Sequence, residues 1–135
     1  MAFLIHSIDN ANVVPWEYLP AGAIQPKIGM ALTQTSGQLA IAATTTKPTY
    51  ISMAEYGSAV TAGTLIPVIK VRDDIVFETT SSANFTSDNK PGTVVQLHGS
   101  SGMQVTATAS SGVATIVSFD GAGKANVDKI RVRFL

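Results

Sequence analysis

Hydrophobic and polar positions alternate most regularly in the last third of the chain. The period of two is clearest in Met103–Ala109 and in Asp128–Phe134, and a shorter run follows it over Val113–Phe119. Successive side chains of a half-buried strand point to opposite faces, so this period predicts β-strands. In the last strand the pattern places three basic side chains on one face: Lys129, Arg131 and Arg133.

Shorter β-like runs, separated by turn residues, precede this region. They are Gly29–Thr33, Gln38–Ala42, Thr49–Met53, Thr64–Val71, Ile75–Thr79 and Thr93–His98. Pro67 lacks a backbone donor, so its position inside one run predicts an edge strand or a bulge. No long segment has a helical period, although residues 54–63 have room for one helical turn. Roughly nine short strands predict an all-β protein, either a small antiparallel β-barrel or a β-sandwich.

Residues 1–27 differ from the rest of the chain because they contain Pro15, Pro20 and Pro26 and show little alternation. Proline removes a backbone donor and favours extended conformations in the residue before it. We therefore predict an extended N-terminal arm over 1–27, followed by a β-barrel or sandwich domain over 28–135. Three apolar side chains would anchor the arm on the same chain or on a neighbouring subunit: Trp16, Tyr18 and Leu19.

Composition narrows the chemistry available to the chain. The 135 residues include no cysteine, which excludes disulfides, thiolate metal sites and cysteine nucleophiles. Charged residues make up 13%, and the formal net charge is zero, so no global basic surface favours nucleic acid. No apolar run reaches the length of a membrane span. A sparsely charged surface rich in small residues suits a protein that packs against other copies or partners.

Side chains that could perform catalysis are few and scattered. His6 and His98 lie in no motif with a nucleophile or a carboxylate, and adjacent Asp73 and Asp74 are typical of a turn. The segment 121–124 resembles a phosphate-binding loop only superficially, since the residue after its lysine is alanine. We expect no catalytic residues, no metal site and no cofactor, and therefore no enzyme.

The basic face of the last strand has two interpretations. Nucleic-acid binding by a small barrel uses aromatic side chains interleaved with basic ones, and no aromatic residue shares the face of Lys129, Arg131 and Arg133. A solvated or subunit-facing surface fits the pattern better. We therefore predict an interface role for these three residues and no nucleic-acid partner.

The chain from Gly29 to its C-terminus resembles small capsid-associated proteins of tailed bacteriophages, described as head decoration, cement or head-fibre proteins. The resemblance is one of texture and order, and the segments that carry it are Gly29–Thr33 with Ser36–Leu39, Lys47–Ile51, Ala62–Val68 and Lys129–Phe134.

This resemblance implies a β-rich structural protein on the outer surface of a virion capsid, made in the host cytoplasm. It would bridge subunits of the major capsid protein and stabilise the shell, as a homotrimer, without nucleic-acid or membrane partners. The long arm with Trp16 departs from the best-known small decoration proteins. The alternative is a fibre or adhesin module that recognises a glycan or a host surface. An enzyme or inhibitor would need a pocket with convergent titratable groups.

Overall fold

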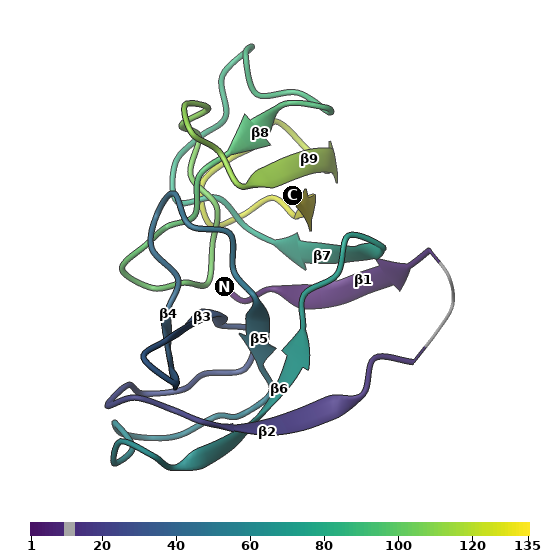
Figure 1. Ribbon diagram of the computed structural model, residues 1–135. Coiled ribbons are helices and arrows are strands. Elements are labelled where there is room, and N and C mark those ends of the chain that lie inside the picture. The colour runs from purple at the N-terminus through teal and green to yellow at the C-terminus, as the bar shows by residue number, and fades with distance from the viewer. Residues whose placement is uncertain (10–12) are drawn as a thin grey trace.

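Ten short strands build the protein in the computed structural model, which describes residues 1–9 and 13–135 (Figure 1). They form two antiparallel five-stranded sheets, which confirms the all-β prediction, and the fold is not a closed barrel. The described residues contain no helix, so the helical turn for which residues 54–63 have room does not form. The strands are β1 (Leu4–Ile8), β2 (Trp16–Pro20), β3 (Ala31–Thr35), β4 (Gln38–Ile41), β5 (Tyr50–Ser52), β6 (Leu65–Lys70), β7 (Ile75–Thr79), β8 (Val94–Val95), β9 (Ala114–Phe119) and β10 (Ile130–Phe134).

The first sheet has the strand order β1-β7-β10-β9-β8 and packs one face against the main hydrophobic core. β10 confirms the alternation in its sequence, because Ile130, Val132 and Phe134 are almost completely buried. The Phe134 ring lies 5.2 Å from Phe3 and 5.5 Å from Phe77, measured between ring centroids. These aromatic contacts join β7 and β10 to Phe3, which lies just before β1. The other face of the sheet carries Glu78 and Arg131, together with the exposed Leu4.

The second sheet, with the order β2-β6-β5-β3-β4, curls around a smaller core. Its end strands approach each other at one parallel bridge between Ala21 and Leu39, where Gly22 N donates to Leu39 O at 2.9 Å. Inside the curl lie Leu32, Leu39, Ile66 and Val68. The outer face meets the main core through Ile51 and Ile69, which places the first sheet over that part of the curl.

Residues 1–27 do not show the predicted proline-containing arm. β1 pairs with β7 in the first sheet, and β2 pairs with β6 in the second. Phe3 is fully buried, and its backbone N donates to Gly29 O at 2.8 Å. The prolines misled the prediction because Pro15 precedes β2 and Pro20 ends it, so both are compatible with an edge strand. The division into 1–27 and 28–135 stays a prediction.

Met103–Ala109 forms no strand, although its sequence alternates as well as that of β10. Only Val105 makes isolated bridges, to Ser81 and to Leu97. Gln104, which the pattern places on the polar face, is buried, and its Nε2 donates to Thr80 Oγ1 at 2.9 Å and Ser81 O at 3.1 Å. The alternating pattern predicts that this side chain is exposed, and it is buried instead. Its burial is tolerated because the amide is hydrogen-bonded.

Pro67 lies in β6, which runs between β2 and β5 and is not an edge strand. The last pair between β5 and β6 joins Ser52 to Val68, so Pro67 lies just beyond the end of β5. Its carbonyl accepts a hydrogen bond from Met53 N at 2.9 Å. The missing proline donor therefore falls where the neighbouring strand has ended, which explains why the sheet tolerates it.

Candidate functional site

β2 presents two aromatic side chains to solvent. Trp16 is 58% exposed and Tyr18 62% exposed, and their spacing of two puts both on the same face of the strand. Leu19 points to the opposite face and packs, half-buried, against the smaller core. Of the three predicted anchors, Leu19 thus contacts its own chain, whereas the two aromatic residues remain open.

β6 extends this aromatic face. Tyr18 pairs with Pro67 and Pro20 pairs with Leu65, so these four side chains lie on one side of the two-stranded edge of the sheet. Leu65 is 59% exposed. We call this surface the β2–β6 patch. It consists of five residues, none of which is charged: Trp16, Tyr18, Pro20, Leu65 and Pro67.

The backbone edge beside the patch is poorly suited to strand addition. Ala21 N donates to Thr64 O at 2.8 Å, so the backbone groups of Ala21 face β6. Along β2, the backbone groups of successive residues then point alternately away from β6 and toward it. The backbone groups of Trp16, Tyr18 and Pro20 therefore face away from β6. Pro20 has no N–H to offer there, and edge prolines protect sheets from pairing with other chains. The side chains of the patch are its means of contact.

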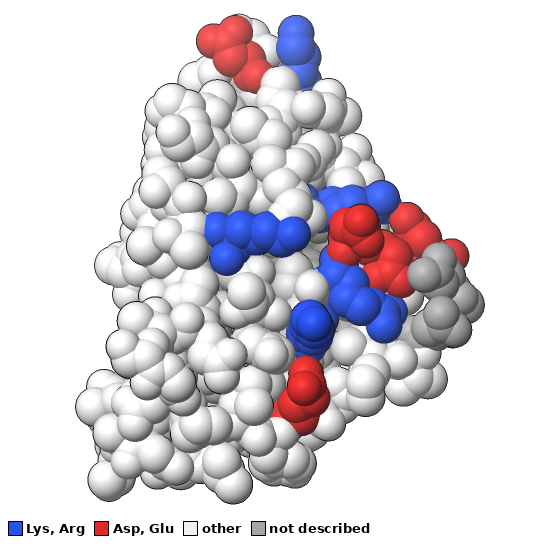
Figure 2. Space-filling view, viewed as in Figure 1, with Lys and Arg blue, Asp and Glu red and all other residues white. Residues whose placement is uncertain are grey.

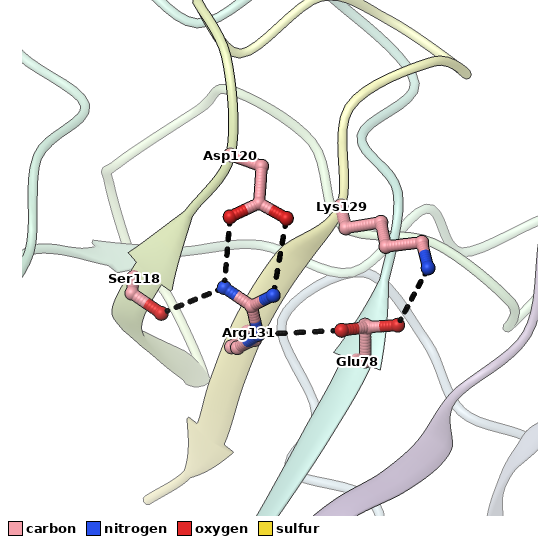
Figure 3. A network of polar contacts seen from close by, with 5 residues as sticks. All are labelled: Glu78, Ser118, Asp120, Lys129 and Arg131. Atoms are coloured by element: carbon pink, nitrogen blue, oxygen red, sulfur yellow. Dashed lines mark hydrogen bonds and ion pairs between the residues drawn. The ribbon is translucent and has the colours of Figure 1, made fainter.

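The predicted basic stripe lies on the outer face of the first sheet, where carboxylates neutralise it (Figure 3). Arg131 makes two hydrogen bonds to Asp120, each 3.1 Å long, and its Nε lies 3.2 Å from Glu78 Oε2. Lys129 Nζ lies 3.7 Å from Glu78 Oε1. Arg133 Nη2 donates to Asp9 Oδ2 at 2.8 Å. All three basic residues thus have acidic partners within the same chain.

The pairing shifts the pKa values of two groups in this network. The hydrogen bonds and the charge of Arg131 lower the pKa of the Asp120 carboxyl below its ordinary value. The same hydrogen bonds raise the pKa of the Arg131 guanidinium, against a smaller effect of desolvation. Both shifts favour the charged forms, so the ion pair persists at neutral pH.

On the visible face, charged side chains gather mainly at the centre and right of the view, with a separate group at the top, and white, uncharged residues cover most of the remainder (Figure 2). The low proportion of charge in the sequence is therefore unevenly distributed over this face. Large uncharged areas desolvate at low cost when another protein covers them.

Several hollows indent the described surface, and two of them are of similar size. One, of about 570 Å³, is lined by Asp73, Val117, Arg133 and Leu135 near the C-terminus. The other, of about 540 Å³, we call the methionine hollow, because Met1, Met30 and Met103 line it together with Ile41. Lys27 and Glu55 also line the methionine hollow and are 3.9 Å apart, and both side chains are substantially exposed.

The two histidines lie apart from any catalytic arrangement among the described residues. His98 Nδ1 is 2.8 Å from Ser101 Oγ, but none of the contacts found for this pair involves a carboxylate. His6 is exposed on β1. Over residues 1–9 and 13–135, no cluster of three or more histidine, aspartate or glutamate side chains could hold a metal ion. No helix in the same residues is long and apolar enough to cross a membrane.

Comparisons with known proteins give no relative. No protein-family model, curated protein or solved structure matches the chain.

Sequence reasoning identified Trp16 and Tyr18 but missed the other half of the patch. Leu65 and Pro67 join it only through the register of β2 against β6, which connects residues far apart in the sequence. The methionine hollow was missed for the same reason, since its lining residues come from the N-terminus, from segments around β3 and β4, and from residue 103. No local pattern connects the two strands of the patch or marks the methionine hollow.

Proposed function

We propose that this protein is a structural virion protein that decorates and stabilises the outer surface of a phage capsid. In that role it bridges subunits of the major capsid protein as a homo-oligomer. The observation that supports this best is the β2–β6 patch, where Trp16, Tyr18 and Leu65 are each more than half exposed on a rigid sheet. Apolar patches of this kind mark surfaces that another protein covers.

The small apolar area of the patch favours many weak contacts in place of one strong binding site. Fully burying one large apolar side chain stabilises by roughly 1.5–3 kcal/mol, so covering the half-exposed residues of the patch gives about 1–2 kcal/mol each. A lattice multiplies such weak contacts, because once one contact of an oligomer has formed, its remaining contacts form at a high effective concentration. The resemblance to capsid decoration proteins supplies the proposed lattice.

Co-sedimentation tests this proposal. The proposal expects the genome that encodes this chain to encode a major capsid protein as well. Capsids assembled from that protein are mixed with the purified chain and pelleted. The proposal expects the wild-type chain to pellet at a fixed ratio to capsid subunits, and the double variant Trp16→Ala/Tyr18→Ala to pellet far less. If the wild-type chain stays in the supernatant at every concentration, the proposal is wrong.

A fibre or adhesin module that binds glycans is the second candidate, and one observation favours it. Trp16 and Tyr18 lie two residues apart on one exposed face, which forms an aromatic platform. Sugar rings stack on such platforms through their apolar faces. A glycan array probed with the wild-type chain and with Trp16→Ala tests this: binding that the variant loses favours this candidate, and an array without signal rejects it.

A further inference from the structure

The connection between β9 and β10 contains Asp120, the one aspartate of the sequence that is followed by glycine. Aspartyl–glycyl linkages are prone to rearrange, because glycine has no side chain to hinder attack by its backbone nitrogen on the aspartyl carboxyl. The Asp120 side chain is 60% exposed and Gly121 is exposed as well, so water reaches both residues. Among residues 1–9 and 13–135, no hydrogen bond from Gly121 N is found. This nitrogen is therefore free to act as a nucleophile.

The fold requires glycine at position 121. Its φ of +70° lies in the left-handed region, and a Cβ there would lie 2.6 Å from both carboxylate oxygens of Asp128. The Asp128 carboxylate closes the turn, because its Oδ2 accepts hydrogen bonds from Ala122 N at 2.9 Å and from Lys124 N at 2.8 Å. A bulkier residue, which would slow the rearrangement, does not fit this turn. Protection must come from the surroundings of Asp120.

We propose that Asp120–Gly121 is a site of spontaneous isoaspartate formation, and that the bidentate contact of Arg131 preserves its unmodified form. In the first step, Gly121 N attacks the side-chain carbon of the protonated Asp120 carboxyl. The new C–N bond closes a succinimide ring, and the hydroxyl leaves as water with the amide proton. Water then adds to the backbone carbonyl carbon of Asp120, whose bond to nitrogen breaks as that nitrogen regains a proton. The chain now runs through the side-chain carbon.

Arg131 opposes the first step in two ways. Its Nη1 and Nη2 donate to Oδ1 and Oδ2 of Asp120, each at 3.1 Å, so both oxygens face the guanidinium (Figure 3). Ring closure needs one of these oxygens to be protonated and released. The hydrogen bonds and the charge of Arg131 also lower the pKa of the Asp120 carboxyl, which keeps it ionised. A carboxylate is a poor electrophile, so the attack by Gly121 N is slowed.

Neighbouring side chains hold the guanidinium in position. Arg131 Nε lies 3.2 Å from Glu78 Oε2, and Nη1 donates to Ser118 Oγ at 3.3 Å. The Arg131 side chain is 20% exposed, whereas its partner Asp120 is largely in solvent. Surface ion pairs of this kind add little to stability. Protection of a reactive linkage is a separate role for the contact, and it does not depend on the proposed function.

Isomerisation removes the contact that opposes it. In the isoaspartyl product the free carboxylate is attached directly to Cα of residue 120, and the backbone is longer by one carbon. The carboxylate is thereby withdrawn toward the backbone and away from Arg131, which retains Glu78 as its partner. We therefore expect the product to have a loosened connection between β9 and β10.

Peptide mapping of aged protein tests the proposal. Purified wild-type protein, Arg131→Ala and Arg133→Ala are incubated at mildly acidic pH, at a temperature where thermal unfolding shows each to be folded, and are then digested. Isoaspartate at residue 120 is identified by chromatographic separation and electron-transfer fragmentation of the peptide, and the succinimide by the loss of one water. We expect Arg131→Ala to accumulate the modification several-fold faster than the wild-type protein.

Two variants of β10 serve as matched controls. Arg133→Ala also removes an arginine with an ion pair, to Asp9, but leaves Asp120 held, so it should modify residue 120 at the wild-type rate. Arg131→Lys keeps a positive charge without the planar fork that grips both carboxylate oxygens, so its rate should lie between those of the wild type and Arg131→Ala. Wild-type protein unfolded in urea gives the rate of the unprotected linkage.

Three results would overturn the proposal. The first is an equal rate for Arg131→Ala and Arg133→Ala. The second is a folded wild-type chain that modifies residue 120 as fast as the unfolded chain does. The third concerns Asp88, an exposed aspartate followed by asparagine. If Arg131→Ala modified Asp88 as much as Asp120, the effect would come from loosening of the whole fold and not from loss of the contact.

Discussion

The two surfaces predicted as interfaces from the sequence differ in what their own chain leaves unsatisfied. On the outer face of the first sheet, Arg131 is held by Asp120 and Glu78, and Arg133 by Asp9. On the second sheet, Trp16 and Tyr18 remain more than half exposed. Charged side chains that are already paired within their own chain gain little binding free energy from another protein, whereas an exposed apolar patch gains free energy when it is buried.

The largest expected effect comes from the inner side of the strand that carries the basic stripe. Phe134→Ala removes a buried ring that contacts Phe3 and Phe77, so we expect a loss of about 3–5 kcal/mol in the free energy of unfolding. Urea denaturation measures it. A loss below about 1 kcal/mol would show that this aromatic cluster is not the centre of the fold.

Trp16→Ala should separate binding from stability. With 58% of the side chain exposed, its removal should change the melting temperature little while it lowers occupancy on capsids about tenfold. Co-sedimentation and thermal unfolding of the same preparation check both halves. Unfolding of this variant at a markedly lower temperature would mean that the patch belongs to the fold.

A substitution in the basic stripe should have the opposite effects, a lower stability and unchanged binding. Arg131→Ala breaks its contacts to Asp120 and Glu78, so we expect a small drop in melting temperature, well below that of Phe134→Ala. Capsid binding should be unchanged. A strong loss of binding at unchanged stability would restore the stripe as a contact surface.

The smallest effect concerns pH. Because folding lowers the pKa of Asp120, its contribution to stability is present above the unfolded-state pKa and is lost as the pH falls through the folded value. Wild-type protein should therefore lose slightly more stability than Asp120→Asn between about pH 5 and pH 2. Thermal melts across that range test it, and parallel curves for the two proteins would contradict the pairing with Arg131.

Local sequence predicted those features that local geometry controls. The alternation of β10 correctly assigned its buried and polar faces. The same alternation failed in Met103–Ala109, because a strand also needs neighbours to pair with, and Gln104 finds buried hydrogen-bond partners instead. Period alone does not report which polar side chains will find such partners.

Long-range pairing explains the remaining errors. Arg133 and Asp9 form an ion pair although they are 124 positions apart in the sequence. The sequence of the last strand alone therefore could not show that its basic side chains are neutralised. The prolines of the first 27 residues suggested a separate arm, yet β7 and β6 lie far along the chain and supply the partners that make β1 and β2 regular. The register between strands carries this information.

A parallel comparison of two double variants on capsids tests the central claim, that contact lies in the β2–β6 patch and not in the basic stripe. Trp16→Ala/Tyr18→Ala and Arg131→Ala/Arg133→Ala are each titrated onto capsids, and occupancy is measured by co-sedimentation. The account predicts that the aromatic pair loses most of its occupancy and the arginine pair keeps it. Retained binding by the aromatic pair, together with lost binding by a folded arginine pair, would contradict it.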